Sequence, residues 1–215
     1  MVAGCSALGD YDNPRGLPRQ PTKIKEALPV CHTLLHNPQL YTLLLQIDEQ
    51  LAEECRVAAC PCGGVLHRAR YARKPRGVLV CLPDMDRRRQ SFCCADCRRR
   101  STPRSVFYLG RRVYVAVMVL LGAAWRGAAS GRALHALCAA LRVPRRTLDR
   151  WLAWWNRTFP STRCWQSLRG DFMPPLTGML PAALLTRLNA QDSLQRLLQV
   201  LRLIAPLSTV TEGRR

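Results

Sequence analysis

Two groups of closely spaced cysteines are the residues best suited to chemistry in this sequence. "CPCGG" at 60–64 and "FCCADC" at 92–97 each offer a pair of thiols beside a turn. A structural zinc site of the ribbon type holds one Zn²⁺ between two such turns, each of which supplies two thiolates. Glycines after the first pair fit this role, because they accept positive φ and let the backbone approach the sulfur atoms. The predicted ligands of this closed, structural site are Cys60, Cys62, Cys94 and Cys97.

The ligand set has alternatives, because the first pair has only one intervening residue where zinc turns usually have two. The substitutes that the sequence offers are Cys55, His67, Cys81 and Cys93. Free thiols in a loop are the alternative to a metal. A metal is favoured, because the region holds few apolar residues and structural zinc contributes folding free energy directly.

The charge of the chain points to an anionic partner. Lys and Arg total 33 against 14 Asp and Glu, which gives a formal net charge of +19. Such an excess repels itself unless an anion relieves it, and the planar guanidinium group suits phosphate and guanine edges. Double-stranded DNA is therefore the leading expected partner, and a coding bias towards arginine is the alternative.

The N-terminus and the apolar runs bear on location. Residues 1–16 have neither the basic start nor the apolar core of a signal peptide, so the 11 cysteines are expected in the reducing cytoplasm. The longest apolar run, 113–125, is too short to span a bilayer and is predicted to be a buried helix. The expected location is cytoplasmic, without a membrane partner.

The cysteines and arginines need helices and strands that hold them in place, and the periodicity of the apolar residues divides the chain into such elements. The predicted segments are a loose tail at 1–37, an amphipathic helix at 38–57 with Asn37 as its N-cap, a zinc ribbon of short strands and loops at 58–105, a helix-turn-helix domain at 110–160, and a Pro-rich break with Leu-rich helices at 161–215. Helices after the ribbon are predicted at 110–126, 131–141, 144–158, 181–189 and 193–204. The expected fold is mainly α with a small β zinc ribbon, a helix-turn-helix three-helix core and extra C-terminal helices.

The segment 132–159 carries two amphipathic helices joined by a short turn. Two helices joined in this way cross steeply and project the second one outward. Arginines near the start of such a helix reach base edges in the major groove, and an aspartate there would accept from cytosine or orient an arginine. The predicted DNA-binding residues of this helix are Arg145, Arg146, Asp149 and Arg150. The tryptophans of the segment lie beside leucines at helical spacing and are predicted to be core.

The pattern "L-x-x-L-x-V-x-x-x-T-L-x-R-W" resembles the helix-turn-helix of bacterial insertion-sequence transposases and their small accessory proteins. In these a zinc ribbon commonly precedes the helix-turn-helix, and "CPCGG…FCCADCRRRSTPRSV…LGRRVY" resembles that ribbon and its basic exit. The resemblance covers roughly residues 55–160. It departs from the pattern at Arg142, where glycine is usual, and at Pro144, where a Ser or Thr cap is usual. A left-handed Arg142 would cost on the order of 1 kcal/mol.

The resemblance implies DNA recognition without a catalytic domain. Acidic residues are few, the histidines form no His-x-His pair, and Asp84 and Asp86 are expected in a solvated loop. The residues expected to track phosphates, with strong sensitivity to salt, are Arg98, Arg99, Arg100 and Arg104. The alternatives are a zinc-ribbon interaction module for a transposase or polymerase and a single-strand or RNA-binding protein. The Leu-rich helices at 181–204 would pair with a second copy or pack within the monomer.

Overall fold

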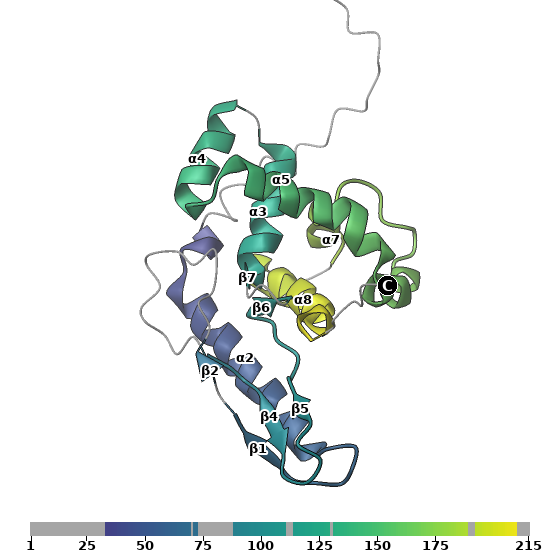
Figure 1. The fold of residues 1–215 in the computed structure, drawn as a ribbon. Coiled ribbons are helices and arrows are strands. Elements are labelled where there is room, and N and C mark those ends of the chain that lie inside the picture. Colours follow the sequence, from purple (N-terminus) through teal and green to yellow (C-terminus); the bar gives the residue numbers. More distant parts are fainter. Residues whose placement is uncertain are drawn as a thin grey trace, which may run out of the picture.

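Helices make up most of the molecule, and a small antiparallel sheet lies at one end (Figure 1). A computed structural model of the chain describes residues 33–69, 71–72, 88–110, 114–129, 131–188 and 192–209. The helices are α2 (Pro38–Val57), α3 (Ala116–Ala128), α4 (Gly131–Leu141), α5 (Arg145–Ala153), α6 (Arg163–Leu168), α7 (Ala182–Arg187) and α8 (Ser193–Ile204). The strands are β1 (Leu66–Arg68), β2 (Tyr71–Ala72), β3 (Arg88–Arg89), β4 (Phe92–Cys94), β5 (Arg100–Ser101), β6 (Tyr108–Leu109) and β7 (Tyr114–Val115).

The long helix α2 covers the residues over which periodicity predicts a helix. Its first turn is capped by Asn37, whose side chain accepts a hydrogen bond from the backbone N–H of Gln39 at 2.9 Å, and Pro38 occupies the first helical position. A helical turn at 33–35 precedes it, and Leu35 is buried with its carbonyl bound to the hydroxyl of Tyr41. The end of the predicted loose tail is therefore packed, while residues 1–32 lie outside the described residues.

Helix α3 lies at the centre of the helical body, and every residue from 116 to 124 is buried. It begins later than the sequence predicts. Tyr114–Val115 forms β7 and pairs with β6 in place of the first turns of the helix predicted at 110–126. The reason is local, because Gly110 adopts a left-handed φ of 64° that ends β6 and reverses the chain, and the β-branched and aromatic residues that follow favour a strand.

Helices α4 and α5 meet through a three-residue turn at 142–144. The N–H of Val143 donates to the carbonyl of Cys138 at 3.1 Å and that of Arg142 to Ala139 at 3.2 Å, which is a Schellman ending. Arg142 has a φ of 49°, the left-handed conformation that a position usually held by glycine implies. Pro144 stands at the N-cap of α5 and offers no side-chain hydrogen bond.

The C-terminal part of the chain packs on the same core. Helix α5 continues through a π-helical turn at Trp154–Thr158, which departs from the plain helix predicted at 144–158, and Trp155 is fully buried there. Helix α6 lies in a segment for which no helix is predicted, and the hydroxyl of Thr162 caps it by accepting from the N–H of Trp165 at 3.1 Å. Helices α7 and α8 insert leucines into the core of the monomer. The fully buried ones among those predicted are Leu184, Leu197 and Leu201.

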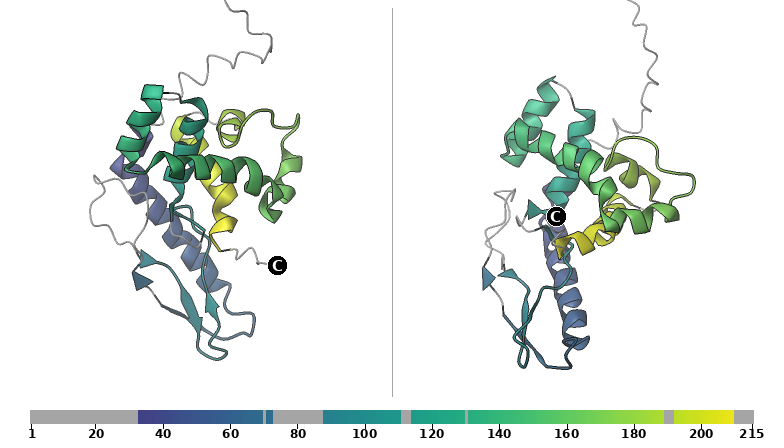
Figure 2. Two further views of the ribbon diagram at one scale, coloured as in Figure 1. Left: turned by 45° about the horizontal axis from the view of Figure 1, so that its top comes forward. Right: turned by 45° about the vertical axis from the view of Figure 1, so that its right-hand side comes forward.

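The sheet at the other end has the order β1–β4–β5, with all neighbours antiparallel. One face packs on the second half of α2, where Ala52, Cys60, Leu66, Phe92 and Cys94 form a separate small hydrophobic cluster. The first half of α2 belongs instead to the large cluster around α3. The helix thus runs along the molecule and serves both clusters (Figures 1 and 2). None of the helices in the described ranges combines the length and apolar character needed to cross a bilayer.

Candidate metal centre and basic surfaces

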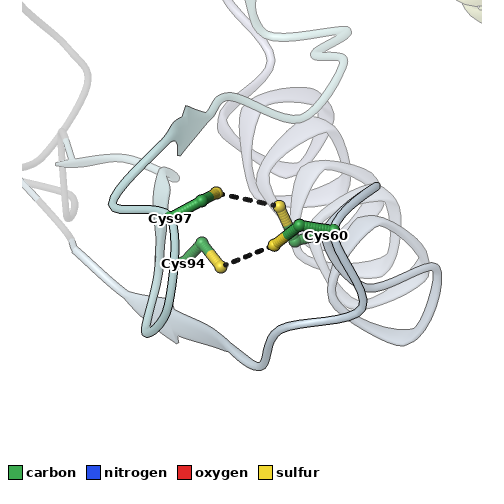
Figure 3. A group of neighbouring side chains, drawn as sticks. Cys60, Cys94 and Cys97 are labelled. Atoms are coloured by element: carbon green, nitrogen blue, oxygen red, sulfur yellow. Dashed lines mark hydrogen bonds between the residues drawn. The ribbon is translucent and has the colours of Figure 1, made fainter.

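Four cysteine sulfurs converge at the end of the sheet. The two turns that carry Cys60 with Cys62 and Cys94 with Cys97 face each other, and all four Sγ atoms lie within 4.8 Å of one another. Cys60 Sγ lies 3.6 Å from Cys97 Sγ, and Cys62 Sγ lies 3.5 Å from Cys94 Sγ. Figure 3 shows the thiols of Cys60, Cys94 and Cys97 pointing into the same space.

Local backbone geometry builds the first turn. The N–H of Gly63 donates to the carbonyl of Cys60 at 2.8 Å, and the N–H of Cys60 donates to the carbonyl of Gly64 at 3.3 Å. Gly63 has a φ of 85°, and a Cβ on Gly64 would lie 2.6 Å from Cys94 Sγ. Both glycines therefore do what the sequence predicts of them, one by conformation and the other by closeness to sulfur.

The second turn is closed from the opposite strand. The N–H of Cys94 donates to the carbonyl of Arg99 at 3.0 Å, and Ala95 donates to the carbonyl of Val65 at 2.9 Å. Arg98 takes a left-handed φ of 58°, which lets the chain reverse directly after Cys97 and enter β5. The turn is thus fixed by the same strand pairing that positions the first one.

The spacing of the sulfurs fits a tetrahedral metal ion. Four thiolates at the usual zinc–sulfur distance of about 2.3 Å have sulfur–sulfur separations of about 3.8 Å. The observed 3.5 and 3.6 Å are close to this value and far longer than the roughly 2.05 Å of a disulfide. The four cysteines are therefore placed to bind one metal ion.

The pKa values of the cysteine thiols differ between Cys60 and Cys62, and a bound cation would favour the thiolate form of both. The backbone N–H of Gly64, together with the three neighbouring thiols, lowers the pKa of Cys62 to about 7. At Cys60 the N–H of Cys62 favours the thiolate, but hydrogen bonds with the other thiols and burial raise the pKa to about 12. Negative charge is thus concentrated on one sulfur, and a divalent cation at the centre would allow all four thiols to ionise.

The substitute ligands that the structure describes lie outside the converging group of sulfurs. Cys93 and His67 are cross-strand neighbours on the face of the sheet opposite to Cys94, because side chains alternate along a strand. Cys55 lies on α2 with its Sγ 3.5 Å from Ser101 Oγ, and it is not among the converging sulfurs. Cys81 falls outside the described residues, as do Asp84 and Asp86.

Three arginines directly follow the second cysteine turn, and a fourth lies after β5. Each of those predicted to track phosphates is exposed: Arg98, Arg99, Arg100 and Arg104. Arg100 lies on β5 opposite Cys93, on the face of the sheet that α2 does not cover. These four side chains are called the ribbon arginines below.

The second basic surface lies on α5. Its inner residues Leu148 and Trp151 are buried, whereas Arg145, Arg146 and Arg150 are exposed. Asp149, which is predicted to accept from cytosine or to orient an arginine, has its carboxylate bound by Arg126 of α3 at 2.7 Å. Sequence patterns gave no sign of Arg126, which ends an apolar run and reaches Asp149 only through the crossing of α3 and α5. The two basic surfaces lie at opposite ends of the molecule (Figures 1 and 2).

Comparison of the chain with family models, curated proteins and solved structures found no match.

Proposed function

We propose that the chain is a zinc-stabilised helix-turn-helix protein that binds duplex DNA with sequence preference. The observation that carries this proposal is the exposed row of arginines on α5, a helix whose opposite face is anchored in the core by Leu148 and Trp151. A rigid helix with such a face has the width and chemistry to enter the major groove, where guanidinium groups bind guanine bidentately.

The proposed metal is Zn²⁺. A closed set of four thiolates is a typical structural zinc site, and soft sulfur ligands in tetrahedral arrangement favour zinc over the harder divalent ions. In this proposal the cysteine turns and the β1–β4–β5 sheet form a zinc ribbon. The metal would have a structural role, since four cysteine ligands fill all the coordination positions of a tetrahedral ion and leave none for a reacting water.

The ribbon arginines would bind phosphates. They are exposed and lie on a separate surface from α5, so they would add affinity without reading bases. Removing one side chain that binds a phosphate should make the slope of log K against log salt shallower by about 0.9. Arg99→Ala is therefore expected to weaken binding to all duplexes alike and to reduce the slope by that amount, whereas Arg146→Ala or Arg150→Ala should lose sequence preference.

Recognition without catalysis is part of the proposal. Among the described carboxylates near the basic surfaces, Asp149 is bound by Arg126, and Glu49 and Glu53 are bound by Arg68. The resemblance to insertion-sequence proteins extends the proposal to a role in a mobile element, beside a transposase or a second copy of the chain. Buried Trp151 and Trp155 favour duplex binding over stacking on single strands, since their rings are not available to bases.

The experiment that tests the proposal is selection of bound duplexes from a random DNA pool by zinc-loaded protein at near-physiological salt. A recovered consensus that Arg146→Ala loses would support recognition by α5. Two inverted half-sites would add a dimer. Recovery without a consensus would reduce the proposal to phosphate binding, and no recovery would overturn it.

A second candidate function is a protein-interaction module at the metal end of the molecule. Val57 and Val65 are 72% and 63% exposed there, beside the cysteine turn. Contiguous exposed apolar patches are typical of a protein contact, and in this candidate the two valines would belong to one. Double-alanine substitution of these valines would leave DNA selection unchanged and abolish capture of a transposase partner if this candidate is correct.

A further inference from the structure

The carboxylate of Asp149 lies between two arginines from different helices. Its Oδ1 accepts a hydrogen bond from Nε of Arg126 at 2.7 Å, and its Oδ2 lies 3.8 Å from Nε of Arg145. Arg126 belongs to the last turn of the buried helix α3, and Arg145 begins α5. The carboxylate therefore connects the core helix to the first arginine of the exposed face.

The three side chains become more exposed from the core outwards. The side chain of Arg126 is 21% exposed, that of Asp149 43% and that of Arg145 69%. Water screens the inner ion pair, Arg126 with Asp149, less than the outer pair, Arg145 with Asp149. The half-buried Arg126 also loses little further side-chain freedom when it binds the carboxylate. Arg126 thus holds the carboxylate of Asp149, and this carboxylate also faces Arg145, which is largely in solvent.

We infer that Asp149 is a positioning residue, which orients Arg145 toward DNA and does not itself contact a base; this inference rests on the proposed function. Two guanidinium groups around one carboxylate leave a net positive charge, so the site still attracts DNA. Arg145 also extends further into solvent than Asp149, whose short side chain is tied back to α3.

A direct contact of Asp149 with the amino group of cytosine is the competing chemistry. For this contact the carboxylate of Asp149 would have to reach the base edge past the side chain of Arg145, which is longer and more exposed. The two roles predict different couplings, since a positioning residue acts only while Arg145 is present.

The test measures dissociation constants for the selected duplex and an unselected duplex at one salt concentration. The proteins are the zinc-loaded full chain, Asp149→Asn, Arg145→Ala and the double variant. We expect Asp149→Asn to weaken binding of the selected duplex, and to tighten that of the unselected one because a negative charge is lost. The ratio of the two constants should change by about tenfold, the scale of one good arginine–base contact. In the Arg145→Ala background the same substitution should leave the ratio unchanged.

A merely structural role would lower the affinity for both duplexes alike and leave their ratio intact, which would overturn the inference. Equal effects of Asp149→Asn with and without Arg145 would also overturn it and favour direct base contact. If Asp149→Asn fails to fold, Arg126→Gln removes the inner ion pair and should change the ratio in the same direction, although the lost positive charge also weakens binding to both duplexes. A wild-type protein that prefers no duplex would instead overturn the proposed function, so the two failures are distinguishable.

Discussion

At the scale of single residues, Gly64 controls the metal centre most directly. A Cβ at this position would collide with Asp96 Oδ2 and lie 2.6 Å from Cys94 Sγ. We expect Gly64→Ala to reduce affinity for the proposed zinc at least roughly tenfold, because the Cys94 sulfur would have to leave the position from which it can complete a tetrahedral set. Competition with a chromophoric chelator measures this. Gly170→Ala is the matched control, since a Cβ there meets no atom within 4 Å. Equal affinity of both variants would contradict the assigned role of Gly64.

Arg142 carries a conformational cost that a simple substitution would remove. Its φ of 49° belongs to the left-handed region, which glycine adopts without penalty. Arg142→Gly should raise the free energy of unfolding by about 1 kcal/mol, as measured by denaturant titration. The control is Arg146→Gly, which removes the same charge but places glycine inside α5, and which should lower the free energy of unfolding by about 0.5–1 kcal/mol. Destabilisation by both variants would show that the arginine side chain at 142 has a compensating contact.

Asp48 is a buried carboxylate that joins α2 to the chain after the ribbon. It accepts hydrogen bonds from the N–H of Val106 at 2.7 Å, the N–H of Phe107 at 3.3 Å and the hydroxyl of Ser105. Asp48→Ala would leave these buried donors without an acceptor and should cost about 3 kcal/mol in the free energy of unfolding.

The titration of Asp48 gives this contact a pH dependence. Burial raises the pKa of its carboxyl above the usual 3.8, an effect that the hydrogen bonds from Ser105 and Val106 reduce. Above pH 3.8 the unfolded chain releases this proton before the folded chain does, so the stability that Asp48 contributes falls as the pH rises through the folded pKa. As the pH rises from 3.8 through the raised pKa of the folded state, wild type should therefore lose stability relative to Asp48→Asn, which does not titrate. A constant difference in the free energy of unfolding over this range would contradict the raised pKa.

At the scale of elements, the crossing of α3 and α5 depends on Gly122. A Cβ on this residue would lie 3.2 Å from Leu141 Cδ1 and 3.2 Å from Trp151 Cζ3. Gly122→Val should therefore force the helices apart and lower the free energy of unfolding by about 1–3 kcal/mol, as thermal melting would measure. Gly127→Val tests the same substitution on the same helix, where the nearest atom, Leu152 Cδ1, is 3.8 Å away. Similar melting temperatures for the two variants would show that the crossing can relax.

The sequence predicts the elements and contacts that depend on residues close together along the chain. It misses those that depend on residues far apart along the chain. The capped helix α2 and the two cysteine turns follow from neighbours within a few residues. The pairing of β6 with β7 was missed, because Tyr114 and Val115 lie at the start of an apolar run that has the composition of a buried helix. Asp48 and Arg126 were missed as well. Their partners lie 57 and 23 residues away in the sequence, and no pattern within one helix points to them.

At the scale of the whole molecule, the proposed metal would support an end that has little core of its own. Two of the buried residues in the small cluster, Cys60 and Cys94, belong to the four cysteines that are placed to bind a metal ion. Removal of the metal with a chelator should therefore lower the melting temperature and increase amide hydrogen exchange at 60–68 and 92–101. Helix α3, which is buried by the other cluster, should keep its protection. Unchanged exchange at 92–101 would show that the sheet is stable without metal.

The sharing of α2 between the two clusters limits how the chain can be divided. A truncation that begins after the ribbon would strip Leu40, Leu44 and Tyr41 from the large cluster, and with them the contact of the Tyr41 hydroxyl with the sulfur of Met118. The cysteine-bearing end and the helical body are therefore not interchangeable modules. Transfer of either end to another scaffold would therefore have to include the half of α2 that packs against it. A gene rearrangement that separated the two ends would disrupt the packing of both.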